Sequence, residues 1–134
     1  MSQAKDIVSI GTVAMDVIEK VSELPRVDGF AVIQTREYLP GGSASNVIAQ
    51  SAKLGASCGF IAKVGDDDIG GHIIRSMSDA GIDVSSCKIK KQGTSLHTSI
   101  IVDDEGQKFI LLNMGDSFLE LTPEELNLEY VKDS

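Results

Sequence analysis

The chain has 134 residues, the size of one ordinary domain, and 42% of them are hydrophobic and 24% charged, a balance typical of a globular protein in water. A net charge of −8 would repel a phosphate backbone, and 4% aromatic residues with no tryptophan leave few platforms for base stacking, so we expect no nucleic-acid partner. No apolar run approaches the roughly 18 residues of a membrane-spanning helix, and the N-terminus lacks a signal-peptide layout. We therefore expect a cytoplasmic protein without a membrane partner.

The first half of the chain alternates between strand-like and helix-like segments. Apolar residues predict a buried strand at 6–11, and a further extended segment at 30–38 meets Pro40 and two glycines. Helical periodicity then predicts a helix at 43–54 that ends near Gly55, and a strand follows at 58–65. A second helix with one apolar face begins after Asp67 or Asp68, either of which can cap it. This alternation predicts a layered α/β fold with a largely parallel sheet.

The second half is richer in strands. Two β-rich runs within 95–113 are joined by the turn formers at 103–106, which predicts a hairpin. Thr122 as N-cap, Pro123 at the first helical position and Glu125 as capping-box partner predict the start of a helix. Because the chain ends nine residues after Glu125, we expect it to be part of a larger fold whose C-terminal half is missing.

Two glycines directly before a helix, with an asparagine in its first turn, form an unusual arrangement. Asn46 is a weak helix former, and Gly41 and Gly42 would let a ligand approach the backbone closely. Asp16, just beyond the first strand, is a further candidate. Each residue alone has an ordinary explanation, as a solvated carboxylate, a turn or a helix end. The glycine pair and Asn46 together predict a polar pocket.

In order and spacing, these motifs resemble the ribokinase-like family of sugar and nucleoside kinases, also called the PfkB family. Asn46, Gly55 and Gly65 have the separations of that family's N-terminal signature, in which a glycine pair precedes the asparagine. "VGDDDIG" at 64–70 resembles the family's valine-glycine-aspartate-aspartate continuation, and "GTVAMD" at 11–16 resembles its opening strand and aspartate. The resemblance spans nearly the whole chain.

The resemblance implies a ribokinase-like layered α/β fold in which strands from about 17–39 and 94–112 form a small β-lid over the sugar. It implies that Asp16 accepts hydrogen bonds from substrate hydroxyls and that the Gly41–Gly42 backbone lies against the sugar. Asn46 would bond a further hydroxyl. Because lid strands in this family often pair between subunits, the resemblance also implies a homodimer.

The nucleotide site and the catalytic base have no counterpart in this chain. The family places the signature that contains them in the C-terminal half, and no "GAGD" or equivalent occurs here. No P-loop pattern and no G-x-G-x-x-G pattern occurs either. Cys58 and Cys87 lack metal-ligand spacing, so we expect reduced thiols and no metal site. We therefore expect no catalytic residue here, with ATP and Mg²⁺ bound mainly by the absent half.

The sequence leaves two functional hypotheses open. The first is the substrate-binding half of an ATP-dependent kinase that phosphorylates a hydroxymethyl group of a sugar or nucleoside, with the 134-residue chain inactive alone. The second is a non-catalytic sugar-binding or dimerising module derived from that family. A Rossmann dinucleotide protein fits the alternating elements, but residues 11–16 lack the glycine spacing that a pyrophosphate requires.

Overall fold

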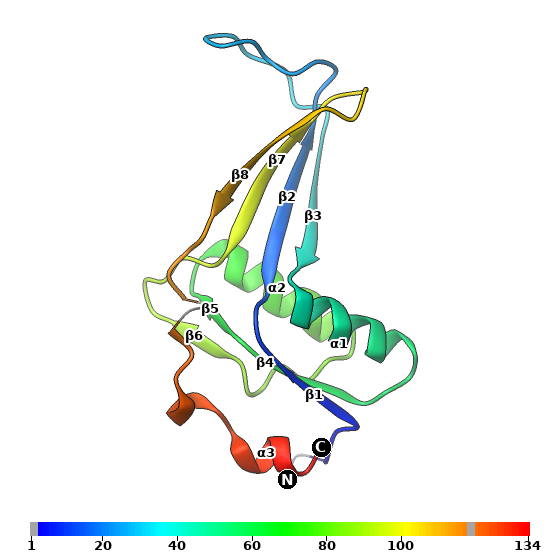
Figure 1. The fold of residues 1–134 in the computed structure, drawn as a ribbon, viewed down its shortest axis with the longest axis vertical. Helices are drawn as coiled ribbons and strands as arrows, with labels where there is room; N and C mark the ends of the chain where they lie inside the picture. The colour runs from blue at the N-terminus through cyan, green and yellow to red at the C-terminus, as the bar shows by residue number, and fades with distance from the viewer. Residues whose placement is uncertain (1–2, 118–119) are drawn as a thin grey trace.

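The computed structural model describes residues 3–117 and 120–134, which form an α/β base and a sheet that projects from it (Figure 1). The base contains two parallel strand pairs, which are β1 (Ile7–Ile10) with β4 (Cys58–Ile61) and β5 (Lys63–Gly65) with β6 (Lys88–Lys90). Its two long helices are α1 (Ser43–Lys53) and α2 (Asp68–Asp79). The layered α/β fold expected from the sequence is confirmed.

The hydrophobic core lies between the strands of the base and the two helices. Every residue of β4 is buried, as expected for a strand covered on both faces. The core is built by Val13, Met15, Ile48, Cys58, Phe60, Ala62, Val64, Ile73, Met77 and Ile82. Asp67 caps α2, because its Oδ1 accepts a hydrogen bond from the Gly70 N–H at 2.9 Å, which confirms the predicted cap.

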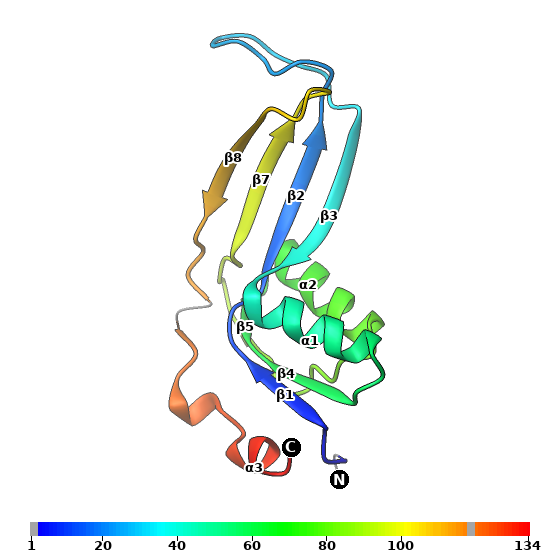
Figure 2. The same ribbon diagram turned by 45° about the vertical axis from the view of Figure 1, so that its right-hand side comes forward.

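Four strands form the projecting sheet, in the order β3 (Thr35–Gly41), β2 (Ala14–Lys20), β7 (His97–Val102) and β8 (Lys108–Asn113). β2 and β7 pair in parallel, and each pairs with its outer neighbour in an antiparallel register. Figure 2 shows all four strands running side by side away from α1 and α2. The turn between β7 and β8 is held by Asp103 Oδ1, which accepts from the Glu105 and Gln107 N–H groups, so the predicted hairpin is confirmed.

Strand boundaries differ from the prediction at two places. The extended segment expected at 30–38 begins only at Thr35 and continues through Pro40 to Gly41. Proline is tolerated there because β3 is an edge strand, whose outer N–H groups need no partner in the sheet. The strand expected at 58–65 is divided into β4 and β5, because the chain changes partner at Ala62 from β1 to β6.

The C-terminal segment contains less helix than predicted. Glu125 reaches back to the Thr122 N–H at 3.2 Å, but the resulting helix is a single 3₁₀ turn, Pro123–Glu125. A separate short helix, α3 (Leu128–Lys132), follows, and its Tyr130 is buried against the base. Within residues 3–117 and 120–134, no helix is both long and apolar enough to cross a membrane.

Candidate functional site

Asp16 lies on β2, where side chains alternate between the two faces of the projecting sheet. Its neighbour Met15 is fully buried in the core, so Asp16 lies on the face of the sheet away from that core. The Asp16 side chain is half-buried, and its Oδ1 accepts a hydrogen bond from Thr98 Oγ1 at 2.6 Å. A residue on the neighbouring strand therefore holds the carboxylate in place.

The glycine pair lies directly beside this carboxylate. A Cβ atom added to Gly41 would be 3.3 Å from Asp16 Oδ2, so the absence of a side chain keeps the space next to the carboxylate open. Gly42 has φ of 101°, and a Cβ there would be 2.6 Å from the Thr12 carbonyl oxygen. Only glycine fits this position without strain. The pair thus lets β3 turn into α1 next to Asp16.

Ser45 supports this turn from inside the protein. It is buried, and its Oγ lies within hydrogen-bond distance of the Gly41 and Gly42 carbonyl oxygens and donates to them. This serine was not among the residues predicted from the sequence. The sequence feature that could have identified it is its position four residues after Gly41 and three after Gly42. At that spacing a serine hydroxyl can reach a backbone carbonyl of the preceding turn.

Asn46 lies in the first turn of α1, where its backbone N–H donates to the Gly42 carbonyl at 2.9 Å. Its side chain is exposed and lines a shallow depression on the surface between α1 and the end of β3. Pro40, Ala49, Gln50 and Lys53 line the same depression. Unlike Gly42, Asn46 is not required by the backbone at this position, so the fold leaves its amide available to a ligand.

Of the predicted site residues, Asp16, Gly41 and Gly42 lie together at the junction between β3 and α1, whereas the Asn46 side chain lines a separate depression that does not include Asp16. Gly41 lies beside the Asp16 carboxylate, Gly42 makes the turn, and Asn46 follows one helical turn later. The junction offers carboxylate oxygens, which accept hydrogen bonds, and an amide, which both donates and accepts. Groups of this kind match a ligand with several hydroxyls.

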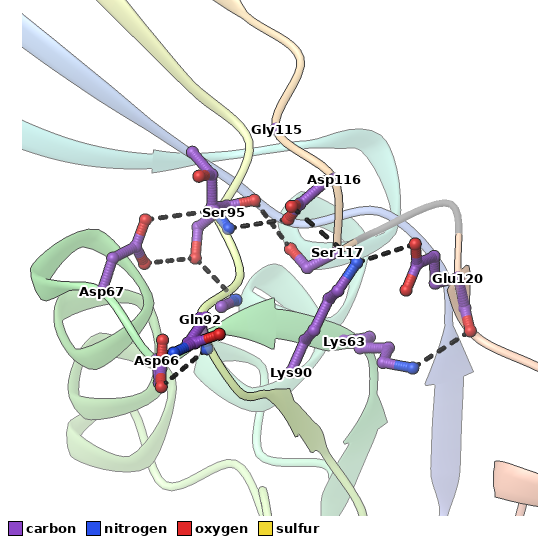
Figure 3. Close-up of polar contacts among 12 residues, drawn as sticks. Lys63, Asp66, Asp67, Lys90, Gln92, Ser95, Gly115, Asp116, Ser117 and Glu120 are labelled. Atoms are coloured by element: carbon purple, nitrogen blue, oxygen red, sulfur yellow. Dashed lines mark hydrogen bonds and ion pairs between the residues drawn. The ribbon is translucent and has the colours of Figure 1, made fainter.

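A second polar cluster connects the base to the start of β7, and Figure 3 shows its side chains converging on that segment. Asp67 accepts from the Ser95 N–H at 2.9 Å and the Ser95 hydroxyl at 2.7 Å, and Ser95 Oγ in turn accepts from the Gly65 N–H at 2.9 Å. Asp116 Oδ1 accepts from the Thr94 N–H at 2.7 Å. The "GDDD" motif therefore anchors the strand that carries Thr98.

The electrostatics of this cluster depend on Asp67. Burial raises the pKa of its carboxyl group, but the hydrogen bonds from Ser95 and from the Gly70 N–H outweigh burial and hold the pKa below its ordinary value of 3.8. Among the described residues, no group of three or more histidine, cysteine or acidic side chains could hold a metal ion.

Comparison with known proteins agrees with this arrangement. The chain matches the pfkB family of carbohydrate kinases over residues 4–133. It is 35% identical to an ATP-dependent ribose-1-phosphate kinase of Halopiger xanaduensis over 96% of the chain and 43% of that enzyme. It is 33% identical to a 5-dehydro-2-deoxygluconokinase of Clostridium beijerinckii, again over 96% of the chain but 38% of the enzyme. The chain thus spans less than half the length of these relatives.

Solved structures share the fold. A ribokinase of Arabidopsis thaliana, solved with ribose and ATP, superimposes with a TM-score of 0.80 over 98% of this chain and 44% of its own, at 21% identity. A putative sugar kinase of Clostridium perfringens gives a TM-score of 0.81 over 98% of this chain and 40% of its own, at 16% identity. The fold is that of the ribokinase-like kinases. The chain belongs to the pfkB family of carbohydrate kinases.

Proposed function

We propose that this chain is the substrate-binding half of an enzyme that transfers a phosphoryl group from ATP to a hydroxymethyl group of a sugar or nucleoside. The observation that carries the proposal is the Asp16 carboxylate, held by Thr98 and placed next to the glycine turn that begins α1. A carboxylate held by one neighbour and facing bare backbone is suited to a polyol, which needs acceptors close to its ring. The names of the relatives support a phosphorylated sugar product.

Each residue of the junction has a distinct role in this proposal. Asp16 accepts hydrogen bonds from substrate hydroxyls, and the Gly41–Gly42 backbone lies against the ring. Asn46 bonds a further hydroxyl. The projecting sheet acts as a lid that excludes water, which would otherwise compete with the substrate for the phosphoryl group. These contacts orient the sugar. None of them requires a residue of this chain to give or take a proton.

ATP and Mg²⁺ belong to the remainder of the enzyme in this proposal. In the part of the chain that the structure describes, no group of three or more histidine, cysteine or acidic side chains could hold a metal ion, and the sequence contains no phosphate-binding glycine pattern. The catalytic base that takes the proton of the substrate hydroxyl is placed there too. The 134-residue chain alone is therefore expected to bind a sugar weakly and to transfer no phosphoryl group. A cytoplasmic location is part of the same proposal.

The test is ATP turnover by the full-length protein with ribose, ribose 1-phosphate, 5-dehydro-2-deoxygluconate and a set of nucleosides. We expect one of these classes to stimulate turnover, and the 134-residue chain to be inactive with all of them. If the full-length protein binds a sugar but shows no turnover, the kinase hypothesis is wrong and the protein is a non-catalytic sugar-binding module. Substrate-dependent turnover by the 134-residue chain would overturn our placement of the base.

A further inference from the structure

We propose that Thr98 is a positioning residue that orients the Asp16 carboxylate for substrate. The inference rests on the proposed function, because it concerns the same site. Thr98 lies 82 residues after Asp16, on β7, and the parallel pairing of β2 with β7 places the two residues directly opposite each other. Opposed residues in a sheet lie on the same face, so the threonine hydroxyl meets the carboxylate.

The contact is specific in its geometry. Thr98 Oγ1 donates to Asp16 Oδ1 at 2.6 Å, in the range of a short hydrogen bond to a charged acceptor. The other oxygen, Oδ2, is the one that faces the open space at Gly41. Because a hydroxyl has one proton to donate, this bond engages one oxygen of the carboxylate and leaves the other to the ligand.

Two features restrict the position of the threonine hydroxyl. Its β-branched side chain has few rotamers on a strand, which restricts where the hydroxyl points. Three residues earlier, the backbone and hydroxyl of Ser95 are bound by Asp67 at the start of α2. The start of β7 is thus anchored to the base. Because Thr98 lies on this anchored strand, its hydrogen bond fixes the orientation of the Asp16 carboxylate. The consequence is a carboxylate that is oriented before substrate arrives, so binding costs less ordering of the side chain.

The test compares Thr98→Val with Thr98→Ser in the full-length enzyme. Valine keeps the branched shape and removes the hydroxyl, whereas serine keeps the hydroxyl. We expect Thr98→Val to lower kcat/KM for the sugar about tenfold, mainly through KM, and Thr98→Ser to stay within about threefold of the wild type. The KM for ATP is expected to be unchanged in both. Ser99→Ala is the matched control, because Ser99 is the next residue on β7 and its side chain lies on the opposite face.

A double-mutant cycle separates positioning from packing. If Thr98 acts through Asp16, Thr98→Val has almost no additional effect on kcat/KM in an Asp16→Ala background, which lacks the acceptor of the threonine hydroxyl. A full tenfold loss in that background, or a Thr98→Val enzyme with wild-type sugar KM, would overturn the inference. Thr98→Ala repeats the measurement if the valine variant fails to fold, as judged from its thermal midpoint. Absence of turnover with every sugar in the wild type would instead reject the proposed function, and the Thr98 role with it.

Discussion

Asp16 and Asn46 offer different hydrogen-bonding groups to a ligand, and their substitution separates substrate binding from fold stability. In the full-length enzyme, Asp16→Asn and Asn46→Ala are each expected to weaken transition-state binding of the sugar by about 1 to 3 kcal/mol, the cost of leaving a buried polar partner unpaired. The KM for ATP should stay constant, because the nucleotide is placed outside this chain. Steady-state kinetics with each substrate varied in turn measures both quantities.

The competing explanation for Asn46 makes an opposite forecast. A residue that serves only the first turn of α1 would, when replaced by alanine, change the thermal midpoint and leave kcat/KM intact. Unchanged kinetics combined with a lowered midpoint would show that the asparagine shapes the helix and does not contact the sugar.

Gly42 is expected to be intolerant of any side chain for two separable reasons. Its φ of 101° is unfavourable for residues with a Cβ, and that Cβ would overlap the Thr12 carbonyl oxygen at 2.6 Å. Gly55 has a similar φ of 98° with nothing within 4 Å of the added atom. We expect Gly55→Ala to cost about 1 kcal/mol of unfolding free energy from the backbone alone, and Gly42→Ala to cost clearly more.

Chemical denaturation of both variants measures this difference. If the two variants lose equal unfolding free energy, the backbone near Thr12 can move away from the added Cβ atom at no cost in free energy. The β3–α1 junction would then be less rigid than the structure indicates.

At the level of elements, the bond between Asp67 and Ser95 makes the attachment of β7 depend on pH. The folded pKa of Asp67 lies below its unfolded value, so the carboxylate adds stability at pH values above the unfolded value and loses it as pH falls through the folded one. We expect Asp67→Asn to lower the unfolding free energy by about 1 kcal/mol at pH 7, since solvent partly screens the site. The deficit should shrink as pH falls below about 4.

Asp68→Asn is the matched control for this experiment. Asp68 carries the same charge in the first turn of α2, but its side chain is exposed. Denaturation curves between pH 3 and 7 are expected to show a pH-dependent deficit for the Asp67 variant only. A deficit of Asp67→Asn that stays constant down to pH 3 would contradict the assigned ionisation.

The elements that the sequence predicted well are those with local signals. The start of α1 after the glycine pair, the cap of α2 by Asp67 and the hairpin between β7 and β8 each depend on a few consecutive residues. The division between β4 and β5 depends on which strand lies alongside, which no local pattern encodes. Thr98 was not predicted from the sequence for the same reason. Its role requires β2 to pair with β7, which places Thr98 opposite Asp16, 82 residues earlier in the chain.

Considered as a whole molecule, the projecting sheet has a large apolar surface at its outer edge. Phe109, Ile110, Leu111 and Leu112 on β8 are 53–64% exposed, and β8 has no strand on its other side within the described residues. Exposed apolar side chains on an unpaired edge favour association with another chain. We propose a second copy of this protein as the partner, joined sheet to sheet.

Sedimentation of the full-length protein tests this assembly. We expect a dimer at about 50 micromolar and a monomer for Leu111→Glu, because a charge on β8 would be buried in the interface. Leu54→Glu, which changes an exposed leucine just beyond α1, is the control and should remain dimeric. A wild-type protein that sediments as a monomer would count against a partner at the projecting sheet.

The parallel pairing of β2 with β7 also has a consequence during synthesis. β2 can pair with β3 soon after both leave the ribosome, but its other neighbour is encoded 82 residues later than Asp16. At about 5 to 20 residues per second, the inner edge of β2 waits roughly 4 to 16 s for its partner. During that interval a nascent hairpin carries an open edge with Val17 and Ile18 on it. The pairing of β2 with β7 can therefore form only after β7 has been made, and until then the edge of β2 is open to other chains.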